Sequence, residues 1–129
     1  MSNVANAAKK SFEDQMQYFE NARIENDLHT VWSIYEVSDI TSNAAIKVAA
    51  KTVVYESVRP DATMKELEAD LRDGGKRSSK MYSATVNGTT WLSLWKAANK
   101  VIIQSGTHHS YIEDFTMNSD GTIELTTGS

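Results

Sequence analysis

The 129-residue sequence contains no cysteine. This excludes disulfides, thiolate nucleophiles, cysteine-based zinc sites and cysteine-ligated iron–sulfur clusters. Proline occurs once, at Pro60, and no repeat or low-complexity linker divides the chain, so we expect a single domain over 1–129. No apolar run approaches the ~18 residues that a membrane-spanning helix needs. The first ten residues lack the apolar core of a signal peptide, so we expect a cytoplasmic protein without a membrane partner.

An excess of basic residues is also missing. Lys and Arg number 13 against 17 Asp and Glu, which makes the net charge −4. A whole-chain field that attracts nucleic acid is therefore absent, and nucleic acid is not the favoured partner. The cations are nevertheless concentrated between residues 72 and 100, where Asp73 is the one carboxylate.

Three segments have the spacing of amphipathic helices. Over 3–25 the apolar residues form one stripe, although Ser11 with Asp14 offers an alternative, later start. Thr63 and Glu66 have the spacing of a capping box for a helix over 64–72. A third helix is predicted over 90–104 and ends at Gly106. The stripe of the first helix consists of Val4, Ala8, Phe12, Met16 and Phe19.

The strands are predicted from β-branched and aromatic residues. Residues 30–38 favour a strand, although 28–37 also fits a helix, and 46–58 is expected to run antiparallel to it. Further strands are predicted at 80–86 and, as a hairpin, at 108–117 and 122–126 around a turn with Gly121. The predicted fold class is α+β, with an antiparallel sheet of four to five strands and about three helices packed on one face.

Such a sheet leaves its other face open. The sequence holds three Trp, five Tyr and three Phe, more than one modest core must enclose. We therefore expect a homo-oligomer, most simply a C2 dimer, in which a second copy covers the open face.

Titratable groups gather at His108, His109 and Glu113, the low-ranked candidates for catalysis. A histidine can act as a general base near neutral pH, with Glu113 orienting it. On a strand, however, His108 and His109 would point to opposite faces, so we expect no metal site. The simpler interpretation, one packed and one exposed histidine, is favoured. No nucleotide-binding or catalytic motif is recognisable, and no cofactor is expected.

The segment after Gly74 and Gly75 is the candidate anion-binding site. Lys76, Arg77 and Lys80 supply cations, and Tyr82 an aromatic face, a combination typical of single-stranded nucleic-acid binding. The favoured alternative is a solvated loop, with the nearby Trp91 and Trp95 in the core. These two tryptophans could also anchor a partner protein.

One segment resembles known proteins. Trp91 to Glu113, with its tryptophan-bearing helix, Gly106 turn, His108-His109 pair and an aliphatic residue before Glu113, looks like small uncharacterised proteins of marine T4-like phages. The resemblance covers about the last 40 residues and implies a small product that acts on host or phage components inside the host cell. It implies no activity.

The function that we expect is a non-enzymatic binding or assembly protein that associates with itself, with a host or phage protein as a further partner. The alternatives are a small enzyme with His109 as base, Glu113 as its orienting partner and Lys76 or Arg77 holding an anion, and a single-strand nucleic-acid binder that uses 72–82.

Overall fold

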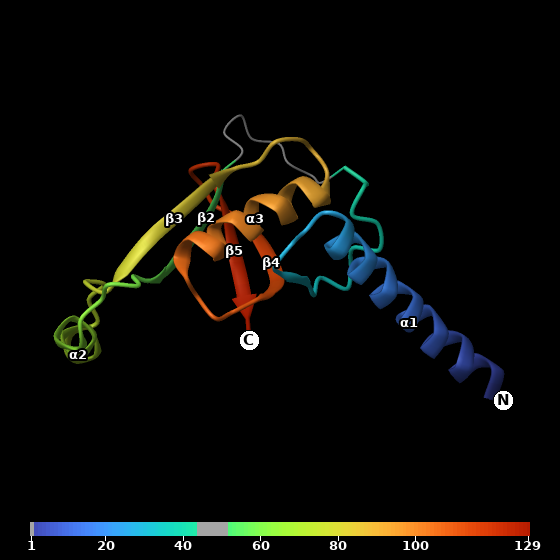
Figure 1. Cartoon of the computed structure of the whole chain (residues 1–129), viewed down its shortest axis with the longest axis horizontal. Coiled ribbons are helices and arrows are strands. Elements are labelled where there is room, and N and C mark those ends of the chain that lie inside the picture. The colour runs from blue at the N-terminus through green and yellow to red at the C-terminus, as the bar shows by residue number, and fades with distance from the viewer. Residues whose placement is uncertain (1, 44–51) are drawn as a thin grey trace.

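A computed structural model describes residues 2–43 and 52–129, and this part of the chain contains three helices and five strands (Figure 1). The helices are α1 (Ser2–Glu25), α2 (Met64–Asp73) and α3 (Trp91–Ser105). The strands are β1 (Val31–Trp32), β2 (Thr52–Val58), β3 (Ser79–Thr85), β4 (Tyr111–Met117) and β5 (Ile123–Gly128).

The five strands form one sheet in the order β1-β4-β5-β2-β3. The sheet is mixed, because β1 runs parallel to β4 and β2 runs parallel to β5, while the β2–β3 and β4–β5 pairs are antiparallel. The α+β class is confirmed, but the prediction of an antiparallel sheet is wrong. After α2, β3 and α3, the chain forms the β4–β5 hairpin, which lies between β1 and β2 in the sheet. Local sequence patterns do not show between which strands a hairpin is inserted.

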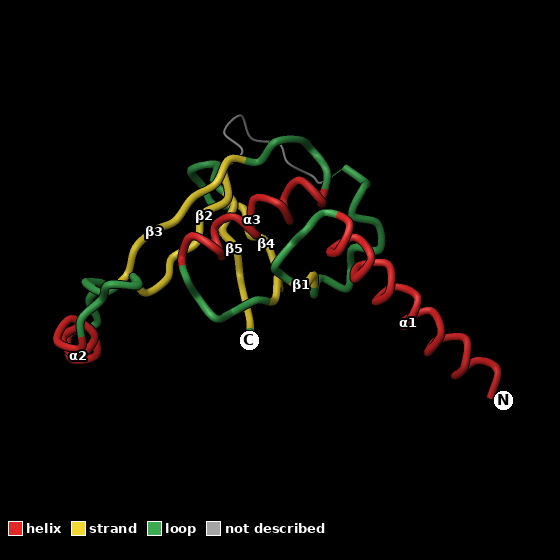
Figure 2. Tube along the Cα trace, in the orientation of Figure 1, coloured by secondary structure: helices red, strands yellow, loops and turns green. Residues whose placement is uncertain are grey.

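The predicted strand over 30–38 is the largest local error. Only Val31 and Trp32 pair with β4, and the chain then turns, with the Val37 N–H donating to the carbonyl of Ile34 (Figure 2). Trp32, Ile34 and Val37 are all buried, so the apolar spacing reflects an irregular segment inserted into the core. The second strand does not pair with this segment, and residues 46–51 of its predicted range lie outside the described residues.

The other elements follow their sequence signals closely. Helix α1 runs through Ser11 without a cap there. Helix α2 has the predicted capping box between Thr63 and Glu66, and it ends at Gly74, whose positive φ of 70° is the left-handed conformation that glycine adopts most readily. The predicted hairpin is confirmed, and the Gly121 N–H donates to the carbonyl of Asn118 across its turn.

Helix α3 covers one face of the sheet and forms the centre of the core. Trp95 is completely buried, which confirms its predicted place in the core. A buried polar cluster joins α3 to the chain before β1. The Asn99 Oδ1 accepts hydrogen bonds from the N–H groups of His29 (2.8 Å) and Thr30 (3.0 Å) and from the Thr30 hydroxyl (3.0 Å). The Trp95 indole N–H donates to the same hydroxyl at 2.9 Å, so these buried polar groups are satisfied.

The other two helices do not share this face, contrary to the prediction. Helix α1 packs against β1 at one edge of the sheet and α2 lies beyond the far end of the β2–β3 pair (Figure 1). Helix α2 has no buried residue. The apolar residues at helical spacing in its sequence therefore do not form a face that packs on the sheet.

The face of the sheet opposite α3 is mainly polar. Its exposed residues include the polar Ser83, Thr85, Thr116, Glu124 and Thr126 and the apolar Val58 and Met81. Most of the large aromatic side chains are instead buried or packed against the core. The argument for dimerisation from an apolar open face therefore loses its basis, and the dimer itself stays a prediction.

Candidate functional site

A cleft of about 380 Å³ lies between α1 and β1, and we call it the α1–β1 cleft. Its volume is within the range of sites that bind small molecules or single side chains. Most of its apolar lining comes from α1, from β1 and from two tyrosines at its outer end: Met16, Phe19, Val31, Trp32, Tyr35 and Tyr111. Polar and charged side chains of α1 complete it: Glu13, Gln15, Gln17, Glu20 and Arg23.

Trp32 holds the inner wall of this cleft in place. Its ring lies 5.3 Å from that of Trp95 and 6.0 Å from that of Phe115, and Phe19 of α1 packs on it at 6.3 Å between centroids. The indole N–H donates to the carbonyl of Ile34 at 3.2 Å. These contacts anchor Trp32 to the core, so the inner wall of the cleft is formed by the fold itself.

Polar contacts attach the second half of α1 to the loop after β1. The Tyr18 hydroxyl donates to Asp39 at 3.2 Å and accepts from the N–H of Ile40 at 3.3 Å. Burial of the Tyr18 hydroxyl raises its pKa, and the neighbouring Asp39 carboxylate adds to this. The backbone carbonyl of Tyr35 accepts a long bond from Gln15 at 3.5 Å.

The charged rim of the cleft is acidic on balance. Arg23 is occupied, because it makes two bonds with Glu20 at 2.5 and 3.0 Å and a third with the carbonyl of Leu28 at 3.2 Å. These bonds lower the pKa of Glu20 and raise that of Arg23. Glu13 adds a second carboxylate to the rim. The cleft therefore suits an apolar group with a positive charge beside it.

A more open hollow continues from the outer end of the cleft. Ser33, Tyr35 and Tyr111 line both, and the hollow extends to Glu113. Glu113 is the extra residue of a bulge in β4, and its carboxylate lies so close to Gly128 that a Cβ there would collide with it. A glycine at 128 is thus needed for this side chain to lie across β5.

The predicted catalytic group is not assembled as expected. His108 and His109 precede β4 in a bend, and their rings lie 5.3 Å apart at nearly a right angle, so the expected placement on opposite faces of a strand is wrong. The His109 Nδ1 lies 3.2 Å from the Thr127 hydroxyl. In the part of the chain that the structure describes, no hydrogen bond joins Glu113 to either imidazole. Over the same residues, no three His, Asp or Glu side chains converge on a metal-sized site.

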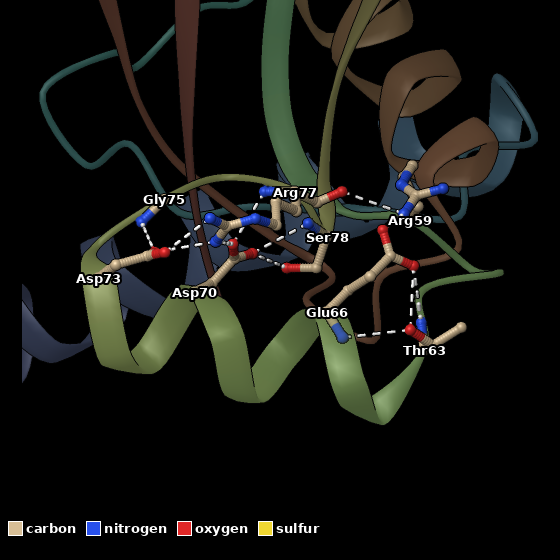
Figure 3. Close-up of polar contacts among 8 residues, drawn as sticks. All are labelled: Arg59, Thr63, Glu66, Asp70, Asp73, Gly75, Arg77 and Ser78. Carbon is tan, nitrogen blue, oxygen red and sulfur yellow. Dashed lines mark hydrogen bonds and ion pairs between the residues drawn. The ribbon is translucent and has the colours of Figure 1, made fainter.

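The predicted anion-binding segment is largely occupied by carboxylates of α2 (Figure 3). Asp70 accepts hydrogen bonds from the N–H groups of Arg77 and Ser78, both at 2.9 Å, and from the Ser78 hydroxyl at 2.6 Å. These bonds lower the pKa of Asp70 to about 2, with those from Ser78 contributing most. Asp73 binds the Arg77 guanidinium through two bonds at 2.6 and 2.9 Å. We call Asp70, Asp73, Arg77 and Ser78 the α2 polar cluster.

The remaining members of the predicted anion site lie nearby, and Lys76 and Lys80 line one open hollow together with Glu56. Lys76 forms an ion pair with Glu56 at 3.2 Å, and Lys80 lies over the ring of Tyr82, 5.3 Å from its centroid. Tyr82 is buried. Arg59 extends the polar contacts of α2, since it pairs with Glu66 and donates to the carbonyl of Arg77 at 3.0 Å. Anion binding by this segment stays a prediction, and it would have to compete with these carboxylates.

Sequence reasoning missed the α1–β1 cleft. Met16 and Phe19 had been placed on one stripe, but only tertiary contacts bring Trp32, Tyr35 and Tyr111 beside them. No signal in the sequence marked these residues, because their exposure is visible only in the structure. Tyr35 and Tyr111 are large aromatic residues that remain 62% and 40% exposed, and exposed aromatic residues often mark binding surfaces.

Comparison with known proteins identifies no relative of this chain. No protein-family description, curated protein or solved structure matches it. Among the described residues, no helix combines the length and apolar character required to cross a bilayer. Functional inference therefore rests on the site itself.

Proposed function

We propose that this protein is a non-enzymatic binding and assembly protein, and that the α1–β1 cleft is where another protein segment docks. The observation that carries the proposal is the composition of the cleft, in which an apolar and aromatic lining lies beside an acidic rim. Aromatic surface supplies most of the affinity at protein interfaces, and rim charges select the partner.

The groups in the cleft are suited to binding rather than to reaction. The guanidinium of Arg23 is engaged by Glu20, and the exposed side chains of Met16, Tyr35 and Tyr111 offer area for contact. The preferred occupant is therefore an amphipathic helix or strand that presents one apolar side chain next to a lysine or arginine. The place of action that we propose is the cytoplasm of a host cell, on the ground of the resemblance to phage proteins.

A pair of peptide probes tests this function. Both are fluorescently labelled synthetic helices with the same leucine stripe, flanked by lysines in one and by glutamates in the other. We expect the lysine peptide to bind the wild-type protein about tenfold more tightly at low salt, because the acidic rim attracts it. Fluorescence anisotropy measures both affinities.

Variants locate the binding. Met16→Glu places a charge on the apolar lining and should abolish binding of the lysine peptide. Met64→Glu is the matched control, because Met64 is also an exposed methionine on a helix but belongs to α2, which lies at the other end of the molecule. Equal binding by both variants, or no preference between the peptides, would rule out the cleft as the docking site.

A further inference from the structure

Helix α1 consists of two unlike halves. Residues 13–25 are attached to the body of the protein. Phe19 and Ala22 are buried, Arg23 bonds to Leu28 just after the helix, and Tyr18 bonds to the loop after β1. The first half, residues 2–12, projects away from the sheet and from the other two helices (Figure 1). Isolated helices of this length are marginal in water, so a partner that packs on this segment would stabilise it.

The projecting half continues an apolar line that ends in the cleft. Positions 4, 8 and 12 hold Val, Ala and Phe, and they follow one another at four-residue steps toward Met16. Met16 lines the cleft, yet it is 54% exposed. Apolar positions at this spacing along a helix are typical of a helix that packs against another helix.

The projecting half of α1 matches in length the part of α1 that lines the cleft. The cleft is lined by α1 residues between Glu13 and Arg23, and the projecting segment 2–12 has the same number of residues. A second copy of α1, laid antiparallel on the first, would therefore place its residues 2–12 along 13–23. By symmetry, residues 2–12 of the first copy would also lie along 13–23 of the second. At 1.5 Å per residue, the two contacts together extend over about 33 Å of helix.

Charge favours this antiparallel arrangement. The only charged residues of 2–12 are Lys9 and Lys10, whereas 13–25 contains four carboxylates and Arg23. Antiparallel packing sets the basic half of one helix against the acidic half of the other. Parallel packing would set like charges together, which destabilises helix pairs.

The position of Lys9 around the helix sharpens this argument. With about 100° between successive residues, positions 9, 13 and 20 all lie on one flank of the apolar line, while position 10 lies on the opposite side of the helix. In an antiparallel pair, the same flank of the two helices meets. Lys9 of each copy would then lie beside the Glu13 and Glu20 of the other copy, on the rim of its cleft.

We propose that the α1–β1 cleft of one copy receives the N-terminal half of α1 from a second copy, and that the two helices pack antiparallel about a two-fold axis. This inference rests on the proposed function of the cleft as a docking site and names its occupant. The axis passes near residues 12 and 13, and the cleft is incomplete in the isolated chain.

The first test is the solution mass of the full chain, measured by light scattering over a wide concentration range. We expect a dimer. Met16→Glu should raise its dissociation constant more than tenfold, because the change occurs twice in the symmetric interface. Lys9→Glu should raise it about tenfold, whereas Lys10→Glu, the same change on the opposite side of the helix, should leave it within about twofold.

The orientation is tested by cross-linking, which the absence of natural cysteine makes straightforward. Ser11→Cys lies near the two-fold axis and should cross-link to its own equivalent with a short bismaleimide. Asn3→Cys should not, because antiparallel packing places the two copies of residue 3 about 28 Å apart. A parallel pair would reverse the result at residue 3.

Three results would overturn the inference: a monomer at every concentration, a dimer that Met16→Glu leaves intact, or efficient cross-linking through Asn3→Cys. The first of these would leave the proposed function standing if the lysine peptide still bound the cleft. Failure of that peptide to bind a monomeric protein would remove both.

Discussion

Helices α1 and α2 lie at opposite ends of the sheet and are held there by different forces (Figure 1). The anchored half of α1 packs aromatic and apolar side chains on Trp32, which belongs to the central core. Helix α2 has no buried residue and is held by the α2 polar cluster and by Arg59 (Figure 3). One end is thus stabilised by burial, and the other by ion pairs and hydrogen bonds.

This difference explains why we assign binding to the α1 end. Beside α2, Lys76 and Arg77 are already paired with carboxylates of the chain, so part of the local basic character of the sequence is neutralised. At α1 an apolar surface and a carboxylate rim remain accessible. Exposed apolar and aromatic surface of this kind is the better candidate for a partner.

The largest expected effect on this contrast between the α1 and α2 ends comes from replacing Trp32, which anchors α1 to the core. Trp32→Ala should lower the free energy of unfolding by about 3–5 kcal/mol, because Trp32 is buried and contacts four aromatic rings. Leu71→Ala on α2 should change it by less than about 0.5 kcal/mol, because Leu71 is 87% exposed. Urea unfolding measures both. Similar losses for the two variants would contradict the contrast between the ends.

Acid should weaken the α2 end through Asp70. Its pKa in the folded protein is about 2, below the ordinary value of 3.8, so its contribution to stability is fully present above pH ~4 and is lost as the pH falls toward 2. We expect the urea midpoint of the wild type to fall over this range, while that of Asp70→Asn changes less. Asp61→Asn, at an 80% exposed side chain, should keep the acid dependence of the wild type. Parallel curves for the wild type and Asp70→Asn would exclude this role.

The smallest effect concerns anion binding. Asp73→Asn removes the carboxylate that holds Arg77 and should strengthen binding of a single-stranded oligonucleotide at low salt about two- to fivefold. Asp120→Asn makes the same change in net charge in the β4–β5 turn and should have less effect. Anisotropy titrations with a labelled oligonucleotide give the comparison. Equal gains would show that net charge, and not release of Arg77, is responsible.

Part of the molecule was predictable because its signals are local. The capping box of α2, the extent of α3 and the C-terminal hairpin depend on residues within a few positions of one another, and each was predicted within one to three residues. The segment 30–38 was not, because its apolar residues contact α1, α3 and β4 rather than one another along a strand.

The candidate site shows the same division. Its α1 residues were predictable as a stripe, but its other wall comes from residues far along the chain, including Tyr111. The cluster of cations around Arg77 was equally visible in the sequence, yet the carboxylate of Asp70 that lies among them had been assigned only to a helix. Charge counts along a chain do not show which charges pair in space.

The sequence by itself determined the helix boundaries, the turn at Gly121 and the absence of cysteine chemistry, because backbone propensities, caps and residue types act over short distances. Only the tertiary structure decided the mixed order of the sheet, the course of the chain over 33–38 and the position of the α1–β1 cleft. Each of these depends on which distant segments bury their apolar surface against one another, and that choice is made by the packing of the whole chain.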